Sequence, residues 1–152
     1  MKFSCKNFLL FTGFLLVFKS PSAQTTINVK QAFEDAARQY RGMLFAHPDI
    51  TKFPQSGNPD GTARDMTSDW WCSGFFGGSL WYLFEYTKDT VWKNAAEKWT
   101  MAVEKEKYNK GTHDLGFMLY CSFGNGYRIS KNEQYKEVML TGAASLATRF
   151  NP

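Results

Sequence analysis

The sequence predicts an all-α fold built from helical hairpins. Apolar residues recur at three- and four-residue spacing in several segments, which is the period of an amphipathic helix. Two consecutive segments also resemble each other: residues 74–75 match residues 116–117 at an offset of 42, and residues 87–93 match residues 130–136 at an offset of 43. Hairpins that repeat with this period must stack on one another to bury their apolar faces. We therefore expect an open solenoid or a closed ring, and the strongly apolar character of one helix in each hairpin favours the ring.

The first 23 residues have the three parts of a secretory signal peptide. Lys2 and Lys6 form a basic start, residues 8–18 are an apolar run, and small residues follow at 20–23. A run of about eleven residues is too short for a permanent membrane-spanning helix. We therefore expect residues 1–23 to be removed and residues 24–152 to be exported to the periplasm or secreted, with no membrane attachment afterwards.

The charge balance gives little support for a nucleic-acid partner. The whole chain has 18 basic and 14 acidic side chains, but three of the lysines and none of the acids lie in the signal. The exported part is therefore nearly neutral, and the basic character of the whole sequence mostly reflects the signal. We expect no nucleic acid among the partners.

The exported part begins with an amphipathic helix from Val29 to Phe45. Its apolar residues follow helical spacing and are Val29, Phe33, Ala36, Ala37, Tyr40, Met43 and Leu44. His47-Pro48 ends this helix, and about twenty residues rich in proline and glycine follow, with a strong turn sequence at 58–61. We expect a long loop here, and loops of such length are often functional.

The first repeated hairpin is expected to pair a helix from Gly74 to Tyr86 with a helix from Val91 to about Lys105. Apolar residues cover nearly every face of the first segment, as in a helix that is buried all round. Residues 87–89 form the turn, and Asp89 or Thr90 can cap the second helix.

The second repeated hairpin follows a polar turn at 108–111. It pairs an apolar, glycine-dotted helix from Asp114 to about Tyr127 with a helix from Glu133 to Phe150. The sequence thus contains about five helices. Because a closed ring needs more hairpins than this, we expect the sequence to be a truncated gene product.

Asp114 is the main candidate for a chemical role, and the residues alone leave two interpretations open. Thr112 or Asp114 can cap the next helix, because the free N–H groups of a helix N-terminus stabilise such side chains. Two opposing effects also act on the pKa of a carboxylate among aromatic residues, because desolvation raises it and the helix N-terminus lowers it. Such a carboxylate suits proton transfer near neutrality. Pattern alone favours the cap.

His113 and Asp69 carry similar alternatives. His113 could tune Asp114 or bind a substrate, but adjacent residues on a helix do not face each other. A structural hydrogen bond explains His113 equally well. Asp69 could simply cap the helix that follows it.

The tryptophans allow a sugar-stacking interpretation, because the apolar face of a pyranose ring packs on an indole while the indole N–H stays available. Most tryptophans in so aromatic a chain belong to the core. We expect Trp71 to be exposed to a cleft and Trp81 to lie in the core, and we leave Trp70 open.

Two cysteines remain after the signal, Cys72 and Cys121. Both lie among apolar residues, where a free thiol is usually a small buried side chain, so a disulfide between them is the less favoured alternative. The sequence contains no CxxC, HExxH or histidine cluster, and we expect no protein-built metal site. The glycines at 74–78 and 124–126 lie in helical patterns, and close helix packing explains them better than phosphate binding.

The two glycine-bearing junctions, taken together, resemble glycoside hydrolase family 88, the unsaturated glucuronyl hydrolases. The resemblance covers about residues 28–152 and is carried by DWWCSGFFGGSLW at 69–81, EYTKD at 85–89 and HDLGFM at 113–118. It implies an (α/α)6 barrel whose inner helices surround a cleft, in agreement with the repeat. Residues 24–152 would be the N-terminal part of that catalytic domain, truncated after about five helices. The resemblance implies neither a metal nor an organic cofactor.

The resemblance also implies a substrate and a set of roles. The family acts on oligosaccharides released by polysaccharide lyases, which carry a 4,5-unsaturated uronic acid at the non-reducing end. An acid protonates C4, an activated water adds at C5, and the resulting hemiketal opens to release the next sugar. Asp114 matches one of the family's two essential carboxylates, Trp71 matches a residue that lines the substrate subsite, and His113 is a further substrate-binding candidate. The second aspartate belongs to a later inner helix, so half of the catalytic pair is missing from this sequence.

Two alternatives to this function stay open. An unsaturated rhamnogalacturonyl hydrolase resembles the same family in fold and chemistry. A non-catalytic α-hairpin module would bind a glycan or a protein without turnover.

Overall fold

The computed structural model describes residues 28–151, and the predicted export signal at 1–23 lies outside them. The elements in chain order are α1 (Val29–Ala46), β1 (Phe53–Gly57), β2 (Ala63–Met66), α2 (Ser73–Thr87), α3 (Thr90–Met101), the 3-10 helix η1 (Glu104–Tyr108), α4 (Leu115–Leu119), the π-helical turn η2 (Tyr120–Gly124), α5 (Asn125–Ser130) and α6 (Glu133–Ala147). The predicted helical-hairpin fold is confirmed. In this part of the chain, no helix is both long enough and apolar enough to cross a membrane.

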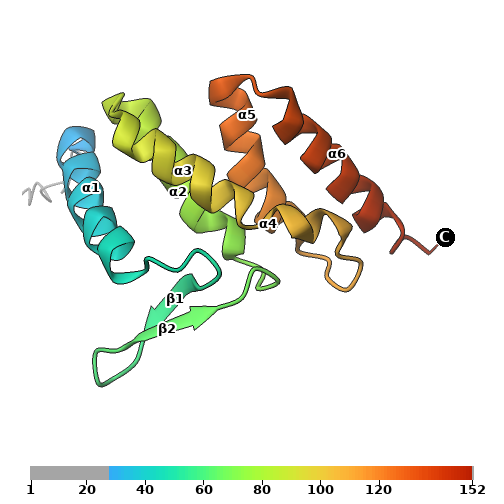
Figure 1. Cartoon of the computed structure of the whole chain (residues 1–152), viewed down its shortest axis with the longest axis horizontal. Helices are drawn as coiled ribbons and strands as arrows, with labels where there is room; N and C mark the ends of the chain where they lie inside the picture. Colours follow the sequence, from blue (N-terminus) through green and yellow to red (C-terminus); the bar gives the residue numbers. More distant parts are fainter. Residues whose placement is uncertain (1–27, 152) are drawn as a thin grey trace, which may run out of the picture.

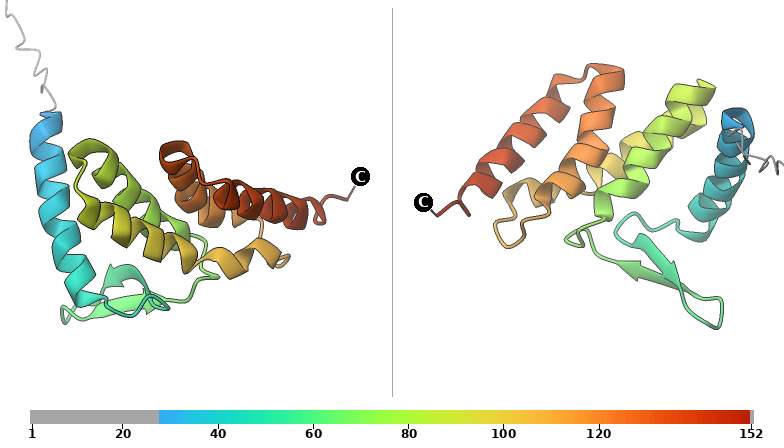
Figure 2. Two further views of the ribbon diagram at one scale, coloured as in Figure 1. Left: turned by 45° about the horizontal axis from the view of Figure 1, so that its top comes forward. Right: turned by 180° about the vertical axis from the view of Figure 1, so that it is seen from behind.

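The helices form a row. Figure 1 shows α1, the α2–α3 pair and the α5–α6 pair following one another, with the β-hairpin beside one end of α1 and α2. In both views of Figure 2, α1 and α6 lie at opposite ends of this row. α1 packs on α2 through two stacked aromatic pairs, Phe33 with Tyr86 and Tyr40 with Phe76, whose ring centroids are 4.0 and 5.4 Å apart.

The two hairpins repeat each other down to their turns. Lys88 after α2 and Lys131 after α5 both adopt the left-handed conformation, with φ of 60° and 57°. The same hydrogen bonds follow in each turn, through Thr87, Asp89 and Val91 in the first and Ser130, Asn132 and Gln134 in the second. In both cases the Asp or Asn side chain caps the outer helix by accepting from a backbone N–H at 3.0 Å. The predicted cap at Asp89 is therefore confirmed.

The inner helices, α2 and the continuous α4–η2–α5 segment, run parallel and in close contact. A Cβ at Gly74 would overlap the carbonyl oxygens of Phe117 and Met118, and a Cβ at Gly78 would lie 2.5 Å from the carbonyl oxygen of Cys121. The contacts advance in the same direction along both segments, which makes the helices parallel. Glycine permits this approach because it has no Cβ. The N-terminal ends of the two inner helices consequently lie on the same side of the row.

The core lies between the hairpins, and seven of its fifteen buried hydrophobic side chains are aromatic. Trp81 is 0% exposed, as predicted, and its indole N–H donates to Thr100 Oγ1 at 2.9 Å. Phe123 of η2 and Tyr135 of α6 meet edge to face, with ring centroids 5.3 Å apart. Buried indoles usually find a hydrogen-bond partner, and here α3 supplies it to α2.

The prediction of a long loop after α1 is wrong for residues 53–66, which form a β-hairpin. Strands β1 and β2 pair antiparallel, with Phe53 opposite Met66 and Gly57 opposite Ala63. The turn sequence at 58–61 closes the hairpin, with Gly61 at φ 83°. Pro54 and the terminal Gly57 weaken the strand pattern in the sequence. A tertiary contact anchors the hairpin, because Phe53 is buried edge-on against Trp99 with 5.4 Å between the ring centroids.

Three predicted helices have different bounds. The helix expected from Val91 to about Lys105 ends at Met101, and the 3-10 turn η1 follows. The helix expected over 114–127 runs to Ser130 but widens to a π-turn at η2. The last helix ends at Ala147. The helix at 74–86, expected to be buried all round, exposes Phe75, Tyr82 and Tyr86 along one stripe.

Candidate active site

The predicted site residues come from the two loops that lead into the parallel inner helices. Trp71 lies just before α2, and His113 and Asp114 lie just before α4. Because Gly74 packs against the carbonyl groups at 117 and 118, these two loops end beside each other. The structure therefore brings the two sequence motifs to the same end of the hairpin pair.

Three aromatic side chains form a half-exposed cluster at this end. Trp71, Phe75 and Phe117 contact one another edge to face, with ring centroids 5.8 to 5.9 Å apart. Trp71 is 45% exposed, so the expectation of an exposed indole is met. Edge-to-face packing fixes the orientation of each ring and leaves aromatic surface open to a ligand.

Asp114 occupies the position of a helix cap but its side chain makes no capping hydrogen bond. Its own backbone N–H donates instead to Thr112 Oγ1, at 3.0 Å. Its backbone carbonyl accepts from Phe117 N at 2.8 Å. The capping interpretation of the Asp114 side chain is therefore wrong. The carboxylate, 24% exposed, is left free of a capping role.

His113 lies closer to Asp114 than the prediction allowed. The two residues precede the helix and are not part of it, so their side chains can meet, with Nε2 of His113 3.4 Å from Oδ1 of Asp114. The imidazole is otherwise open to solvent, 83% exposed. Adjacent residues on a helix face apart, but His113 and Asp114 lie in a loop, where their side chains can approach each other.

Asp69 does not cap α2. The N-cap position of α2 is Cys72, and it makes no side-chain capping bond. The Asp69 carboxylate accepts instead from the hydroxyl of Thr67, inside its own loop. Trp70, which the sequence left open, is partly buried and contacts Trp71 edge to face at 6.2 Å.

Cys72 and Cys121 are both free thiols. Burial raises the pKa of the Cys121 thiol. For Cys72, burial is the largest cause of a raised pKa, followed by the negative charge of Asp114 and the neighbouring Cys121. The effect of Asp114 on Cys72 is a second indication that its carboxylate lies near the loop that carries Trp71.

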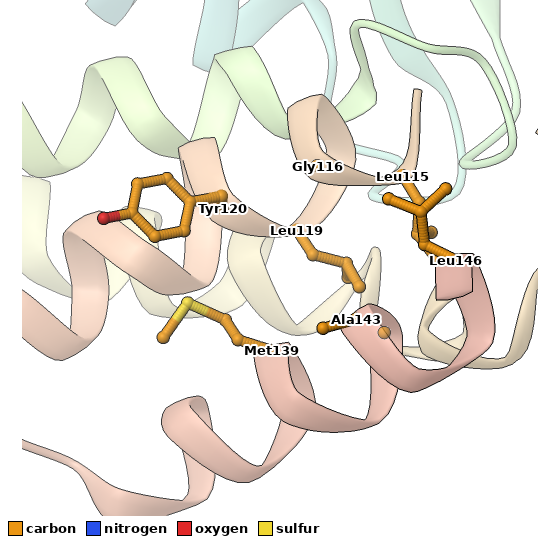
Figure 3. A pocket seen from close by; sticks show the side chains of 8 residues that line it. Leu115, Gly116, Leu119, Tyr120, Met139, Ala143 and Leu146 are labelled. Carbon is orange, nitrogen blue, oxygen red and sulfur yellow. The ribbon is translucent and has the colours of Figure 1, made fainter. Parts of the chain in front are cut away.

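A separate apolar hollow lies between α4 and α6. It has a volume of about 140 Å³ and is lined by Leu115, Gly116, Leu119, Tyr120, Met139, Gly142, Ala143 and Leu146. Figure 3 shows it from close by. Neither Trp71 nor Asp114 lines it. It offers almost no polar groups to a sugar, so we do not count it as part of the site. Across residues 28–151, no three His, Cys, Asp or Glu side chains gather where a metal could bind.

Sequence comparison finds curated relatives of one kind. The chain is 35% identical over 127 residues to an unsaturated glucuronyl hydrolase of Formosa agariphila, a match that covers 82% of this chain and 32% of the relative. It is 29% and 30% identical to unsaturated chondroitin disaccharide hydrolases of Streptococcus agalactiae and Streptococcus pneumoniae, again covering 83% of this chain and 32% of each relative. No protein-family model matches the sequence. The chain thus spans about a third of the length of these relatives.

Solved structures agree with the sequence comparison. An unsaturated glucuronyl hydrolase specific for heparin matches with a TM-score of 0.75 and 40% identity, over 80% of this chain and 33% of its own. A mutant Streptococcus agalactiae unsaturated glucuronyl hydrolase, complexed with dGlcA-GalNAc6S, matches with a TM-score of 0.65 and 26% identity, over 84% and 35%. These neighbours have an (α/α)6-barrel fold, and this chain covers about a third of their length.

Proposed function

We infer that this chain is the portion of an unsaturated glucuronyl hydrolase, of glycoside hydrolase family 88, that carries Asp114 and Trp71. The observation that carries the proposal is the free carboxylate of Asp114 at the same helix ends as the half-exposed cluster of Trp71, Phe75 and Phe117. An aromatic face and a carboxylate are the two groups that a sugar ring uses for stacking and for hydrogen bonding through its hydroxyls.

The proposed substrates are lyase-generated oligosaccharides of the glycosaminoglycan type. The similar proteins are named for unsaturated glucuronyl, unsaturated chondroitin disaccharide and heparin substrates. We propose that the feature recognised in the substrate is a 4,5-unsaturated uronic acid. In the proposed reaction this residue is protonated at C4 and takes up water at C5, and the hemiketal then opens. The next sugar leaves as the product.

Each site residue has a role in this proposal. Protonation of C4 creates positive charge at C5 and the ring oxygen, and an ionised Asp114 stabilises that charge through space. Trp71 packs against the sugar ring. His113, exposed and 3.4 Å from Asp114, can donate a hydrogen bond to the substrate and orient the carboxylate. The second carboxylate of the proposed pair is not among the residues described above.

We also propose that the enzyme acts outside the cytoplasm. The support is the three-part signal pattern at residues 1–23. Export would place the enzyme where extracellular polysaccharide fragments arrive. An amino-terminal sequence beginning near residue 24 in protein recovered from the periplasm or medium is expected.

A chimera tests the activity. Residues 28–151 replace the aligned third of the Formosa agariphila relative, and the chimera is incubated with unsaturated disaccharides from chondroitin, heparin and pectin. Hydration removes the ultraviolet absorbance of the double bond. We expect this loss with glycosaminoglycan-derived disaccharides. Asp114→Asn should lower kcat by at least about a hundredfold, because it removes a charge that acts in the transition state.

A control variant checks that the loss of activity depends on the carboxylate of Asp114. Asp60→Asn removes an exposed carboxylate at the tip of the β-hairpin and should leave kcat unchanged. Turnover of the pectin-derived disaccharide alone would replace the proposal with a rhamnogalacturonyl hydrolase. A folded chimera that binds a disaccharide without turnover would favour the non-catalytic module.

A further inference from the structure

Glu106 is a buried carboxylate with no direct place in the proposed site. It lies in η1 and is 6% exposed. The ion pair formed on the same turn, Lys107 Nζ to Glu104 Oε1 at 2.7 Å, does not include it. A buried carboxylate is tolerated when hydrogen bonds replace the lost water, so its partners show what it does.

The two oxygens of Glu106 hold two different loops. Ser68 Oγ donates to Oε1 at 2.5 Å, and Asn109 Nδ2 donates to Oε2 at 2.9 Å. Ser68 lies three residues before Trp71, and Asn109 lies five residues before Asp114. A carboxylate has two acceptor oxygens, so one side chain can bind a donor from each loop at once.

The η1 turn and the loop after it are held in place by α6 and the residues that follow it. Ser145 Oγ donates to the carbonyl oxygen of Lys107 at 2.7 Å, and Arg149 Nη1 donates to that of Lys110 at 2.9 Å. Asn109 also shapes its own loop, since its Oδ1 accepts from Gly111 N at 2.8 Å. Glu106 is therefore a fixed point to which both loops are attached.

We propose that Glu106 is a positioning residue that sets Trp71 and Asp114 relative to each other. It contacts neither reacting atoms nor substrate, and acts through Ser68 on one side and Asn109 on the other. The claim that this spacing serves a substrate rests on the proposed function. The attachment of both loops to the Glu106 carboxylate is independent of the proposed function.

The test uses nuclear magnetic resonance on this chain and reads the two loops separately. The probes are the indole N–H signal of Trp71 and the backbone N–H signal of Asp114. Glu106→Ala should shift both signals, Ser68→Ala that of Trp71 alone, and Asn109→Ala that of Asp114 alone. Glu106→Gln should leave both signals near their wild-type positions, because the amide oxygen can accept from Asn109 while the amide N–H donates to the Ser68 hydroxyl.

Glu104→Ala is the matched control, since Glu104 lies on the same turn but binds neither loop. It should leave both signals in place. The proposal is overturned if Glu106→Ala shifts neither signal. It is also overturned if Glu106→Ala shifts signals evenly over α3 and α6 and Glu106→Gln gives the same shifts. If Glu106→Ala does not fold, the separate responses of Ser68→Ala and Asn109→Ala decide the question.

Kinetics of the chimera add a second readout. Ser68→Ala should raise KM with little change in kcat, because Trp71 binds the sugar before and during reaction alike. Asn109→Ala should lower kcat, because Asp114 acts in the transition state. Equal changes in KM and kcat for both variants would contradict the division of roles. An inactive wild-type chimera would reject the proposed function and leave the resonance test of Glu106 standing.

Discussion

At the scale of single residues, the backbone at Asp114 determines what its carboxylate can do, because its ψ of 11° differs from the extended values of the residues that do cap helices here, such as Asp89 with ψ of 118°. Sequence pattern favours Asp114 as a helix cap, and its backbone does occupy that position. The hydroxyl oxygen of Thr112 accepts a hydrogen bond from the backbone N–H of Asp114, and the Asp114 carboxylate makes no capping hydrogen bond. A sequence shows which residues can cap a helix, but whether a candidate side chain does so depends on backbone dihedral angles that no spacing rule gives.

Tryptophan roles were easier to predict, because burial follows the hydrophobic pattern. The sequence predicts Trp81 in the core and Trp71 exposed to a cleft. Trp81 is buried and Trp71 is exposed, and the cleft stays a prediction. The contacts between aromatic side chains were not predictable. Phe117 lies 42 or more positions after Trp71 and Phe75, and its contacts with them depend on how closely the inner helices approach. The catalytic and binding roles of Asp114, Trp71 and His113 stay predictions.

Replacing the two tryptophans should separate stability from binding. Trp81→Phe removes the donor to Thr100 in a sealed core and should lower the free energy of unfolding by about 2 kcal/mol. Trp71→Phe, at an exposed site, should change it by less than about 0.5 kcal/mol. Urea unfolding of the chain measures both. Equal losses would mean that Trp71 is a core residue and would remove it from the proposed site.

At the scale of elements, periodicity located every long helix but missed three local features. The β-hairpin at 53–66 is held by tertiary burial of Phe53. The turn η1 replaces the last turn of a helix whose sequence pattern continues past Met101. The π-turn η2 inserts into an inner helix whose residues look uniformly helical. Each depends on packing between elements, which a single segment of sequence does not encode.

Two glycines at equivalent repeat positions should respond in opposite ways to alanine. Gly74→Ala places a Cβ on the carbonyl groups of Phe117 and Met118 and should cost about 3 kcal/mol of unfolding free energy. Gly116, its repeat equivalent, has nothing within 4 Å of a Cβ. Gly116→Ala should therefore be neutral or stabilising by up to about 1 kcal/mol. Thermal unfolding followed by circular dichroism compares them, and equal destabilisation would contradict the packing described above.

At the scale of the whole molecule, one ion pair joins the two repeats. Arg128 of α5 donates to both carboxylate oxygens of Glu85 in α2, at 2.6 and 2.7 Å. The hydrogen bonds from Arg128 are the largest cause of the lowered pKa of Glu85. Positions 85 and 128 are equivalent in the repeat, so neighbouring hairpins are joined through matching positions of opposite charge.

The pH dependence of stability should show this pair. A carboxyl group whose pKa is lower in the folded state stabilises the fold above its ordinary value of 4.5, and the stabilisation is lost as pH falls through the lowered value. Both side chains are partly exposed, so solvent screens the pair, and Glu85→Gln should cost about 0.5 kcal/mol at neutral pH. The difference from wild type should vanish in strong acid. Glu97→Gln, which breaks an ion pair within α3, is the control and should cost less.

The ring arrangement was predictable from the repeat because each hairpin has one strongly apolar helix. The solved neighbours have that closed (α/α)6 arrangement, and the row of helices in this chain corresponds to about a third of their length. What the repeat could not show is that the two motifs meet at one end of parallel helices. That follows from the glycine contacts, and the proposed function depends on it.

A crystal structure of the chimera with Asp114→Asn, soaked with an unsaturated chondroitin disaccharide, tests this arrangement most directly. We predict the unsaturated ring against the indole of Trp71, with the amide of residue 114 in hydrogen-bond distance of a ring hydroxyl. A disaccharide bound elsewhere, or a side chain at 114 that points into bulk water away from it, would contradict the proposed site.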